Sequence, residues 1–360
     1  MHHSPVISSR RRSLGMSLIE IMVGLAIALV TTLVIFEVFS TSMASNRTTS
    51  SGNEAQISGG IGMFQLERDL KVAGMGFGTL TQMSAAGVPC NVNAINPALT
   101  PATFSFPLVP VVITPGAGPV PDQIDVLYGN SAYMTAGRTY QSGSLSSKIT
   151  VSRGGIHPGD LAVLTDPLLP PTVCEMVEIT SDANTDGLTV NHVQGAGYTN
   201  FYSGAAVVAT RNSAGTPATL NGTGRLYNLG PQPTLNQWRV VNTSLGLSNL
   251  FSSGVASPVA EGIVNLKAQY GVDTSTTTPP AGVVNSWTTT APVNWSQVLA
   301  IRFALLARSS QLEKSPVTAV APTWVGGSFD MSAIPNWQNY RYRVYESVVA
   351  MRNLIWGTSP

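Results

Sequence analysis

The stretch SDANTDGLTV is the part of the sequence whose residue types and spacing could bind a metal ion. Asp182, Asn184, Asp186 and Gly187 match the first half of an EF-hand calcium loop, in which oxygen ligands alternate along the chain. The bidentate glutamate of that loop would fall at Val193, and a strand is expected to follow instead of a helix. Asp, Asn and Gly are also the residues that a hairpin turn requires. The pattern therefore predicts a turn, with weak calcium binding as the alternative.

Residues that could carry out catalysis are sparse. The sequence contains no H-E-x-x-H, no G-x-S-x-G, no P-loop and no G-x-G-x-x-G before a helix. His157 stands in the Pro-Gly turn GIHPGD, where a surface position is expected. Glu175 and Glu178 lie three apart in a predicted strand, on opposite faces, so they cannot act as a carboxylate pair. We expect a protein that is not an enzyme and that uses no cofactor.

The sequence has two cysteines, Cys90 and Cys174. In an oxidising compartment they would most simply form a disulfide. A loop of that size would stabilise the fold by roughly 4–5 kcal/mol in the chain-entropy model. The alternative is two unrelated buried thiols, but the N-terminus favours export and hence the disulfide.

An apolar run near the N-terminus carries a carboxylate close to its start. No charged residue occurs from Ile21 to Phe36, and Glu20 stands directly before that stretch. A charged side chain inside a membrane helix costs roughly 2.5–3.5 kcal/mol on insertion scales and is rare without a partner or a task. Glu20 therefore either snorkels to the membrane surface or pairs with a positive group.

The element that positions Glu20 is a predicted transmembrane helix over residues 16–39. At about 1.5 Å per residue, a helix of that length spans roughly 36 Å, enough to cross the hydrocarbon core. Arg10, Arg11 and Arg12 precede it and would stay in the cytoplasm, which places the rest of the chain outside. A secretory signal peptide is the competitor, with FSTSMAS as a weak cleavage region, but its apolar core is shorter and carries no carboxylate.

The order of a basic leader, Gly15, Glu20 and a long apolar helix resembles the class III signal of type IV pilins and type II secretion pseudopilins. The resemblance implies that a prepilin peptidase cleaves between Gly15 and Met16 and methylates the new amino terminus. Family members often have Phe where Met16 stands. It also implies that Glu20 of one subunit faces the Met16 amine of a neighbour in a filament and so fixes the axial register, because each buried charge alone would be costly.

The composition describes an exported protein rich in β structure and turns. Charged residues make up 10% of the 360-residue chain, well below the usual quarter, and Gly, Ser, Thr, Asn and Pro are abundant. The net charge is +1, and removal of the leader would leave the chain slightly acidic. A basic nucleic-acid footprint is absent, so we expect no direct binding of nucleic acid.

After Phe39 the sequence predicts a helix that continues, with more polar residues, over residues 40–77. Interruptions are expected near residues 51–52 and 59–60, because Gly59, Gly60 and Gly62 weaken a helix by about 1 kcal/mol each. The second half of the helix is expected to pack on a globular domain. Two sets of apolar residues fit one broad helical face: Ile57, Ile61 and Phe64, and Met63, Leu66, Leu70 and Ala73.

Residues 78–360 are predicted to form a β-rich globular domain, so the fold class is α+β, with a long N-terminal helix on mainly antiparallel sheets. Residues 72–121 are expected to be a long irregular surface stretch, and residues 274–297 a long exposed connection. Strand signals fall at 123–129, 148–153, 159–166, 174–180, 188–193, 205–211, 225–230, 238–242, 263–273, 298–309 and 340–353.

Several later stretches resemble the PilW-type minor pilins in particular: FQLERDLKVAGMG, RLYNLGPQP followed by WRVV, EGIVNLKAQYGVD, WSQVLAIRFALLARS and YRYRVYESVVAMRNLIW. The resemblance implies a minor pilin that primes assembly of a type IV pilus and enters its tip or base, supporting twitching motility, adhesion and DNA uptake. The alternatives are a large minor pseudopilin of a type II secretion system and an anchored extracytoplasmic binding protein.

The same resemblance implies partners and a location. The partners are other minor pilins, the major pilin, a tip adhesin-like protein, the prepilin peptidase and the inner-membrane assembly platform. Residues 1–15 would be a leader peptide, and residues 16–39 would serve first as an inner-membrane span and later as filament core. The C-terminal domain would lie in the periplasm and then on the pilus at the cell surface.

Overall fold

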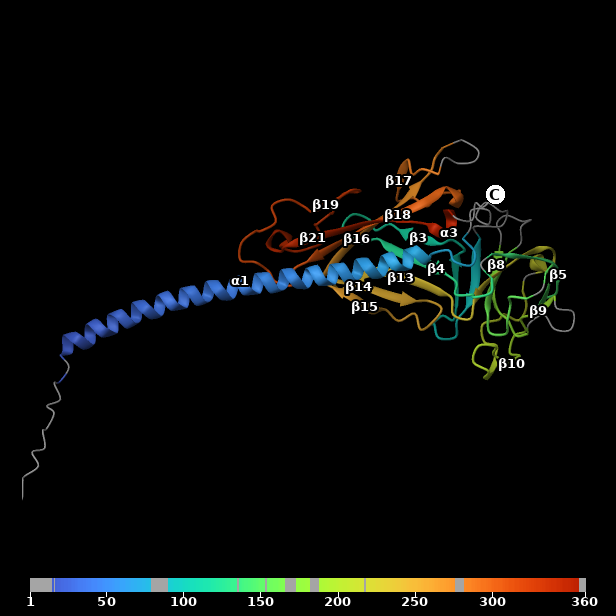
Figure 1. Ribbon diagram of the computed structural model, residues 1–360, viewed down its shortest axis with the longest axis horizontal. Coiled ribbons are helices and arrows are strands. Elements are labelled where there is room, and N and C mark those ends of the chain that lie inside the picture. The colour runs from blue at the N-terminus through green and yellow to red at the C-terminus, as the bar shows by residue number, and fades with distance from the viewer. Residues whose placement is uncertain are drawn as a thin grey trace, which may run out of the picture. The chain divides into compact units, whose positions relative to one another are not determined.

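A computed structural model describes residues 15, 17–78, 90–134, 136–152, 154–165, 173–181, 188–216, 218–275 and 282–355. The chain divides into two compact units, Met1–Gly52 and Asn53–Pro360. The first unit is helical where it is described, and the second combines the end of that helix with β-sheets (Figure 1). The predicted α+β class is confirmed.

Helix α1 (Leu18–Val72) runs without a break, so the interruptions expected near residues 51–52 and 59–60 are wrong. The helix ends in a turn where Gly74 and Gly76 adopt φ values of 81° and 94°, which favour glycine. The Gly74 amide donates to the carbonyl of Leu127, 2.8 Å away, which fixes the helix end to the sheet.

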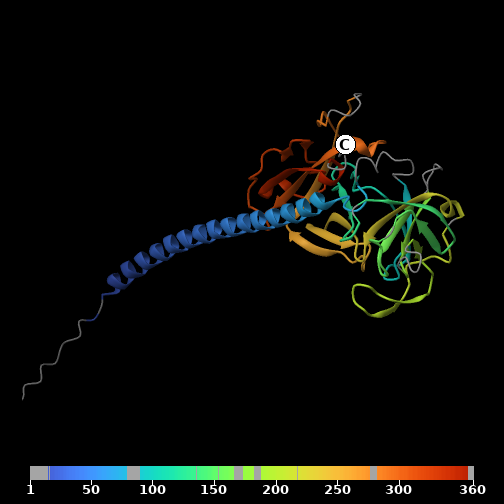
Figure 2. The same cartoon turned by 45° about the vertical axis from the view of Figure 1, so that its right-hand side comes forward.

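An eight-stranded sheet has the order β2-β1-β8-β7-β12-β5-β6-β9. Among the described pairs of this sheet, β1 and β8 are parallel and the other neighbours are antiparallel. Its strands are β1 (Asn91–Ile95), β2 (Thr103–Pro107), β5 (Arg138–Gly143), β6 (Ser147–Thr150), β7 (Leu161–Thr165), β8 (Val173–Glu178), β9 (Thr189–Asn191) and β12 (Gly224–Gly230). In Figure 2 its green strands gather in a lobe of their own.

Two further antiparallel sheets lie beside the second half of α1 in Figure 1. Their orders are β15-β14-β13-β4-β3 and β17-β16-β18-β21. The five strands of the first are β3 (Val111–Thr114), β4 (Gln123–Tyr128), β13 (Thr234–Val241), β14 (Ser244–Asn249) and β15 (Ser257–Glu261). The four of the second are β16 (Ile263–Val272), β17 (Ser286–Thr288), β18 (Val298–Arg308) and β21 (Tyr342–Ala350).

Short elements complete the domain. Two hairpins stand apart from the sheets: β10 (Gly197–Thr199) with β11 (Ala206–Val208), and β19 (Thr323–Trp324) with β20 (Gly327–Ser328). The short helices are η1 (Ala218–Asn221), η2 (Trp295–Gln297), η3 (Trp337–Asn339) and α3 (Arg352–Ile355).

A disulfide joins Cys90 to Cys174, with their Cα atoms 5.9 Å apart, as the sequence predicts. Cys90 directly precedes β1, and Cys174 lies in β8, where it pairs with Val92. The bond therefore links the two neighbouring strands of the parallel pair. Both cysteines are buried and belong to the main hydrophobic core.

The expectation of an irregular surface stretch over residues 72–121 is wrong, because β1, β2 and β3 lie within it. Val92, Leu108 and Val111 are buried in the main core. A stretch without charges suits strands that are covered by other elements, and its prolines stand mostly in the turns between them. In the predicted connection over 274–297, Ser286–Thr288 form β17, and residues 276–281 lie outside the described residues.

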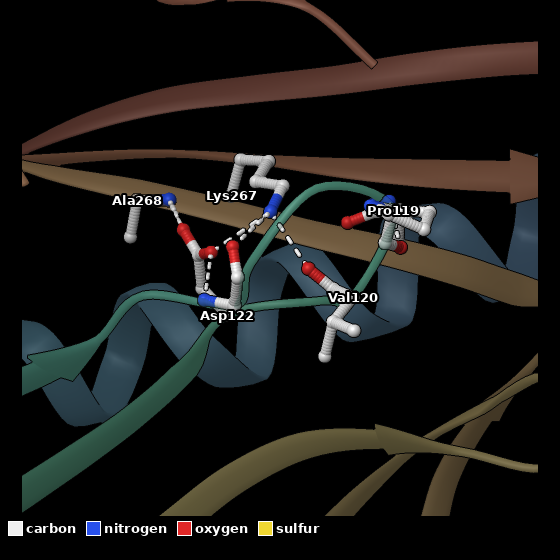
Figure 3. Close-up of polar contacts among 7 residues, drawn as sticks. Pro119, Val120, Asp122, Lys267 and Ala268 are labelled. Carbon is white, nitrogen blue, oxygen red and sulfur yellow. Dashed lines mark hydrogen bonds and ion pairs between the residues drawn. The ribbon is translucent and has the colours of Figure 1, made fainter. Parts of the chain in front are cut away.

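A buried ion pair ties the five-stranded sheet to the four-stranded sheet (Figure 3). Lys267 Nζ of β16 lies 3.0 Å from Asp122 Oδ1, and it also donates to the carbonyl of Val120 at 2.8 Å. The other oxygen of Asp122 accepts from the amide of Ala268 at 2.9 Å. Because both charges are paired and further hydrogen-bonded, the loop between β3 and β4 is fixed on β16.

Candidate membrane and assembly segment

The apolar N-terminal part of α1 is long enough to span a membrane. Leu18–Met43 comprises 26 residues with a mean hydropathy of 2.6, and within this chain none of its side chains is buried. Leaving so many large apolar side chains in water is unfavourable, by about 1.5–3 kcal/mol for each Val, Leu, Ile, Phe or Met. The segment therefore fits a single-pass membrane anchor, and it needs lipid or other protein chains to cover it.

Hydroxyl groups inside the span are satisfied by the helix itself. Thr31 Oγ1 donates to the carbonyl of Ile27 at 2.7 Å, and Thr32 Oγ1 donates to that of Ala28 at 2.6 Å. Thr41 makes the same bond to Glu37, at 2.9 Å. Such bonds remove the penalty of a polar group in hydrocarbon. Glu20 and Glu37 remain as the charged side chains of the span.

Glu20 lies in the first turn of α1 and is exposed within this chain. Its amide, like that of Ile21, donates to the carbonyl of Ser17, which starts the helix. In the described part of this chain no basic side chain pairs with the Glu20 carboxylate. A carboxylate at the apolar end of an uncovered helix is available for a positive group of another molecule.

At Gly15 the described structure shows no steric contact that would exclude a larger residue. A Cβ atom placed on it would meet no other atom within 4 Å, and the residue is exposed. Packing against the described residues therefore does not require glycine at this position. Met16, the predicted site of cleavage and methylation, lies outside the described residues.

The second half of α1 is seated on the sheets of the second unit. Leu66, Leu70 and Ala73 are buried in the main core, which includes Trp238 and Leu305 from the strands. This part of the predicted apolar face is confirmed. The hydrophobic core thus makes the end of the helix an integral part of the globular domain.

Two glycines let the helix approach the sheets closely. A Cβ atom on Gly59 would lie 2.1 Å from the ring of Tyr345, and one on Gly62 would lie 3.1 Å from Leu245. Gly60, between them, faces open space. The favourable contacts of the close approach offset the low helix propensity of Gly59 and Gly62, which explains why the helix continues through them.

Asp69 is the polar tether between the helix and the five-stranded sheet. It is buried, and its carboxylate accepts hydrogen bonds from Asn236 Nδ2 at 2.6 Å, Trp238 Nε1 at 2.8 Å and the Tyr128 hydroxyl at 3.3 Å. Burial raises the pKa of Asp69, and the hydrogen bonds act in the opposite direction. The three donors come from β4 and β13, so this side chain fixes the rotation of α1 about its axis and its position along that axis relative to the sheet.

Further polar contacts hold the last turns of α1 to β21 and α3. Ser347 donates to Glu67, which also pairs with Lys71 at 3.0 Å, and the Ser347 hydrogen bond is the main cause that lowers the pKa of Glu67. Asn353 Nδ2 donates to the carbonyls of Val72 at 3.1 Å and Ala73 at 2.9 Å. These bonds satisfy carbonyl groups that the end of a helix leaves without partners.

The opposite face of the seated helix is apolar and exposed. Ile57, Ile61 and Phe64 follow a spacing of four and three, and their side chains are between 46% and 65% exposed. The expectation that they share one buried face with Leu66 and Leu70 is wrong, because the sheets cover only one side of the helix. The three side chains, here called the outer stripe, resemble an interaction surface more than a solvated helix face.

The described residues among the other candidates are held by separate sets of partners. Glu175 is held by Ser213, whereas Glu178 accepts from Tyr198 at 2.7 Å and from two backbone amides, so each carboxylate has its own partners. His157 lies in the expected turn and stacks on Phe201, with ring centroids 3.9 Å apart. The calcium candidates Asp182, Asn184 and Asp186 lie outside the described residues. Within the described part of the chain, no cluster of three metal-ligating side chains occurs.

Asp69, Asp122 and Lys267 were not identified from the sequence. A signal for Asp69 exists, since it lies three residues after Leu66 and four before Ala73, on the buried face of the helix. A charged residue at such a position is expected to have buried partners. Asp122 and Lys267 carry no such signal, because they are far apart in the chain and are brought together only by the packing of two sheets.

Comparison with known families identifies the C-terminal part of the chain. The family model described as Type IV Pilus-assembly protein W, PilW, matches residues 225–353. The match begins in β12 and ends in α3, so it includes β13 and β21, two of the strands that contact the helix, but not β4. No curated protein and no solved structure matches the chain. The match supports a type IV pilus-related protein and interaction with components of that pilus in general.

Proposed function

We propose that this chain is a minor pilin that primes the assembly of a type IV pilus and is incorporated in it. The observation that carries the proposal is α1, in which an uncovered apolar span continues unbroken into a half seated on a β-rich domain. The family match covers the C-terminal part of that domain, residues 225–353. A helix of this kind can move from lipid into the interior of a filament, because its apolar side chains are covered in both environments.

Processing by a prepilin peptidase is the first step of the proposed function. The peptidase cleaves after Gly15, and Met16 becomes the methylated first residue. The open surroundings of Gly15 support this step, since no atom of the described residues would lie within 4 Å of a Cβ placed there. Cleavage leaves the span of α1 intact, unlike removal of a secretory signal peptide.

Glu20 then fixes the register between subunits. In the filament it faces the Met16 amine of an adjacent subunit, and the two charges stabilise each other in surroundings of low dielectric constant. The span has few other polar groups, and its threonines are internally hydrogen-bonded, so this pair would dominate the axial alignment. Snorkelling of Glu20 to the lipid surface is the competing explanation.

The outer stripe of Ile57, Ile61 and Phe64 supports packing against neighbouring subunits. The sheets cover one side of the helix and leave these apolar side chains uncovered on the other. The proposed neighbours are other minor pilins and the major pilin, with a tip adhesin-like protein as a further partner and the inner-membrane platform as the site of assembly. Motility, adhesion and DNA uptake follow from the pilus, without enzymatic activity, cofactor or direct nucleic-acid binding by this chain.

The proposed location is the inner membrane, with the second unit in the periplasm, followed by the pilus at the cell surface. The Cys90–Cys174 disulfide supports an oxidising compartment for that unit. A large minor pseudopilin of a type II secretion system is the second candidate, because it would share the signal and the helix. The family match, which is to a type IV pilus-assembly protein, favours the pilus.

Deletion of the gene and complementation with the full chain test the proposal. We expect the deletion strain to lose most surface pili, counted by electron microscopy, while secretion of exoenzymes through the type II system stays normal. Normal pilus numbers with a loss of exoenzyme secretion would contradict the pilus assignment and favour the secretion system. Normal pili together with normal secretion would leave the anchored binding protein as the best explanation.

A further inference from the structure

A cluster of exposed aromatic side chains comes from three connections of the second unit, those between β4 and β5, between β6 and β7, and between β10 and β11. Tyr133, Phe201 and Tyr202 are 55%, 48% and 40% exposed. His157 lies among them, stacked on Phe201 with centroids 3.9 Å apart and edge-on to Tyr133 at 4.8 Å. These four side chains are here called the aromatic platform. Exposed aromatic rings in contact with one another are unusual on a surface that only faces water.

The platform is held rigidly by a buried carboxylate beneath it. Asp160 Oδ1 accepts from the Tyr202 hydroxyl at 2.6 Å, and Asp160 Oδ2 accepts from the His157 amide at 2.8 Å and from Asn228 Nδ2 at 2.7 Å. The Phe201 amide donates to the carbonyl of Pro158 at 3.0 Å. The rings are therefore fixed before any ligand arrives, which lowers the entropy lost on binding.

A hollow of about 590 Å³ is lined by residues of the same two segments that carry three of the platform rings. Gly159 stands two residues after His157, and Asn200 directly precedes Phe201. Its polar lining includes Glu178, Arg211 and Gln232. Glu178 is fixed by the Tyr198 hydroxyl at 2.7 Å and by the amides of residues 210 and 211, so its orientation is set by the fold. The volume is within the range of small-ligand sites.

The charges of this region indicate what it can bind. Asp160 is the only acidic or basic residue other than histidine in the platform segments 131–134, 155–160 and 197–204, and it is buried. In the hollow, one carboxylate and one guanidinium offset each other. Within these segments an acidic or basic polymer would find no exposed charge of opposite sign. A neutral ring with an apolar face and many hydroxyl groups fits both the aromatic rings and the planar polar side chains beside them.

We propose that the aromatic platform and the adjoining hollow form a binding site for neutral carbohydrate. A hexose ring stacks its C–H face on Phe201 and contacts Tyr133, whose ring stands at 78° to that of Phe201. Its hydroxyl groups, or those of the next sugar, bond to the polar side chains of the hollow. The proposal does not rest on the role of the chain in a pilus, because the site lies wholly within the second unit.

The test uses the full chain in phospholipid nanodiscs, because alkyl glycoside detergents carry sugar headgroups that would compete. The probe is an array of neutral oligosaccharides of glucose, galactose and N-acetylhexosamines, with sialylated and uronate-containing counterparts. We expect binding to at least one neutral series. Phe201→Ala and, separately, Tyr133→Ala should each lower the affinity at least about tenfold, and Phe201→Trp should retain it.

Phe64→Ala is the matched control, since it removes an exposed aromatic ring from the outer stripe and should leave carbohydrate binding unchanged. Thermal midpoints identify a variant that fails to fold, and saturation-transfer NMR of the wild-type chain then reports directly whether aromatic protons contact the sugar. Binding of acidic glycans alone, or of none, would overturn the proposal. So would platform variants that bind like the wild type, or a pilus protein captured through Phe201 in place of any glycan.

Discussion

At the scale of residues, Glu20 and Glu37 are the two carboxylates of the apolar span, but only Glu20 has a role in the proposed assembly. Glu20→Gln removes the charge and keeps the shape. We expect this variant to be inserted and cleaved, yet to restore few surface pili, because an unpaired Met16 amine buried in the filament costs about 3–5 kcal/mol.

Glu37→Gln is the control for this experiment and should restore normal pilus numbers. Complementation of the deletion strain, with pili counted and cleavage checked in the same cells, provides both results. Wild-type piliation by Glu20→Gln would show that the carboxylate does not set the register, even if the chain is a pilin.

His192 is a second residue with a testable effect, in this case on the dependence of stability on pH. It is buried, and burial together with the Lys148 ammonium lowers the pKa of its imidazole to about 3. The folded pKa lies below the unfolded value of about 6.5, so neutral His192 contributes stability above pH 6.5 that is lost as the pH falls toward 3.

Replacement of this imidazole should therefore flatten the acid side of the stability profile. We expect His192→Leu to lose less unfolding free energy than the wild type between pH 6.5 and 4, by up to about 1.4 kcal/mol per pH unit. Chemical denaturation at several pH values measures the difference. Parallel profiles for the two proteins would mean that folding does not lower the pKa of His192.

At the scale of elements, the glycines of α1 distinguish packing from helix propensity. Gly59→Ala should destabilise the domain, because the new Cβ would overlap the Tyr345 ring. Gly60→Ala is the matched control, and since its side faces open space it should stabilise the domain by about 0.5–1 kcal/mol. Thermal denaturation of the two variants is the measurement, and equal shifts of the same sign would contradict the seating of the helix.

The disulfide is the second element-scale test, because it joins the parallel pair of β1 and β8. We expect Cys90→Ser and Cys174→Ser each to lower the free energy of unfolding by about 2–5 kcal/mol. Alkylation of the denatured wild-type protein checks the bond itself. Two alkylated cysteines in protein from the periplasm would contradict it.

The same elements show what can be predicted from the sequence. Strands such as β4, β16 and β18 carry their signal locally, in runs of apolar and β-branched residues. The sequence does not predict β1, because its five residues stand in a Pro-rich stretch without a strong strand pattern. Of its two neighbours, β2 lies in the same stretch and β8 is more than eighty residues away. The sequence also does not predict that α1 continues through Gly59. The helix contacts Tyr345 there, and no local sequence pattern indicates a contact between residues so far apart in the chain.

At the scale of the whole molecule, each of the two units has a surface that it cannot cover by itself. The span of the first unit is wholly exposed, and the second unit leaves the outer stripe uncovered. Uncovered apolar surface of this kind is typical of chains that function in a membrane or an assembly. The sequence predicts the span, because its apolar residues form one continuous run. It does not predict the outer stripe, because only the packing of the sheets on α1 determines which helix face stays exposed.

The mass of the N-terminal peptide, in protein purified from native membranes, shows whether α1 is kept in the mature protein. We predict a chain that begins with N-methylated Met16 and retains the whole of α1, and we predict that Gly15→Val leaves an uncut and unmethylated precursor. A mature wild-type chain that begins after Phe39 would rule out the proposed assembly, because the helix proposed to enter the filament would then be absent from the mature protein.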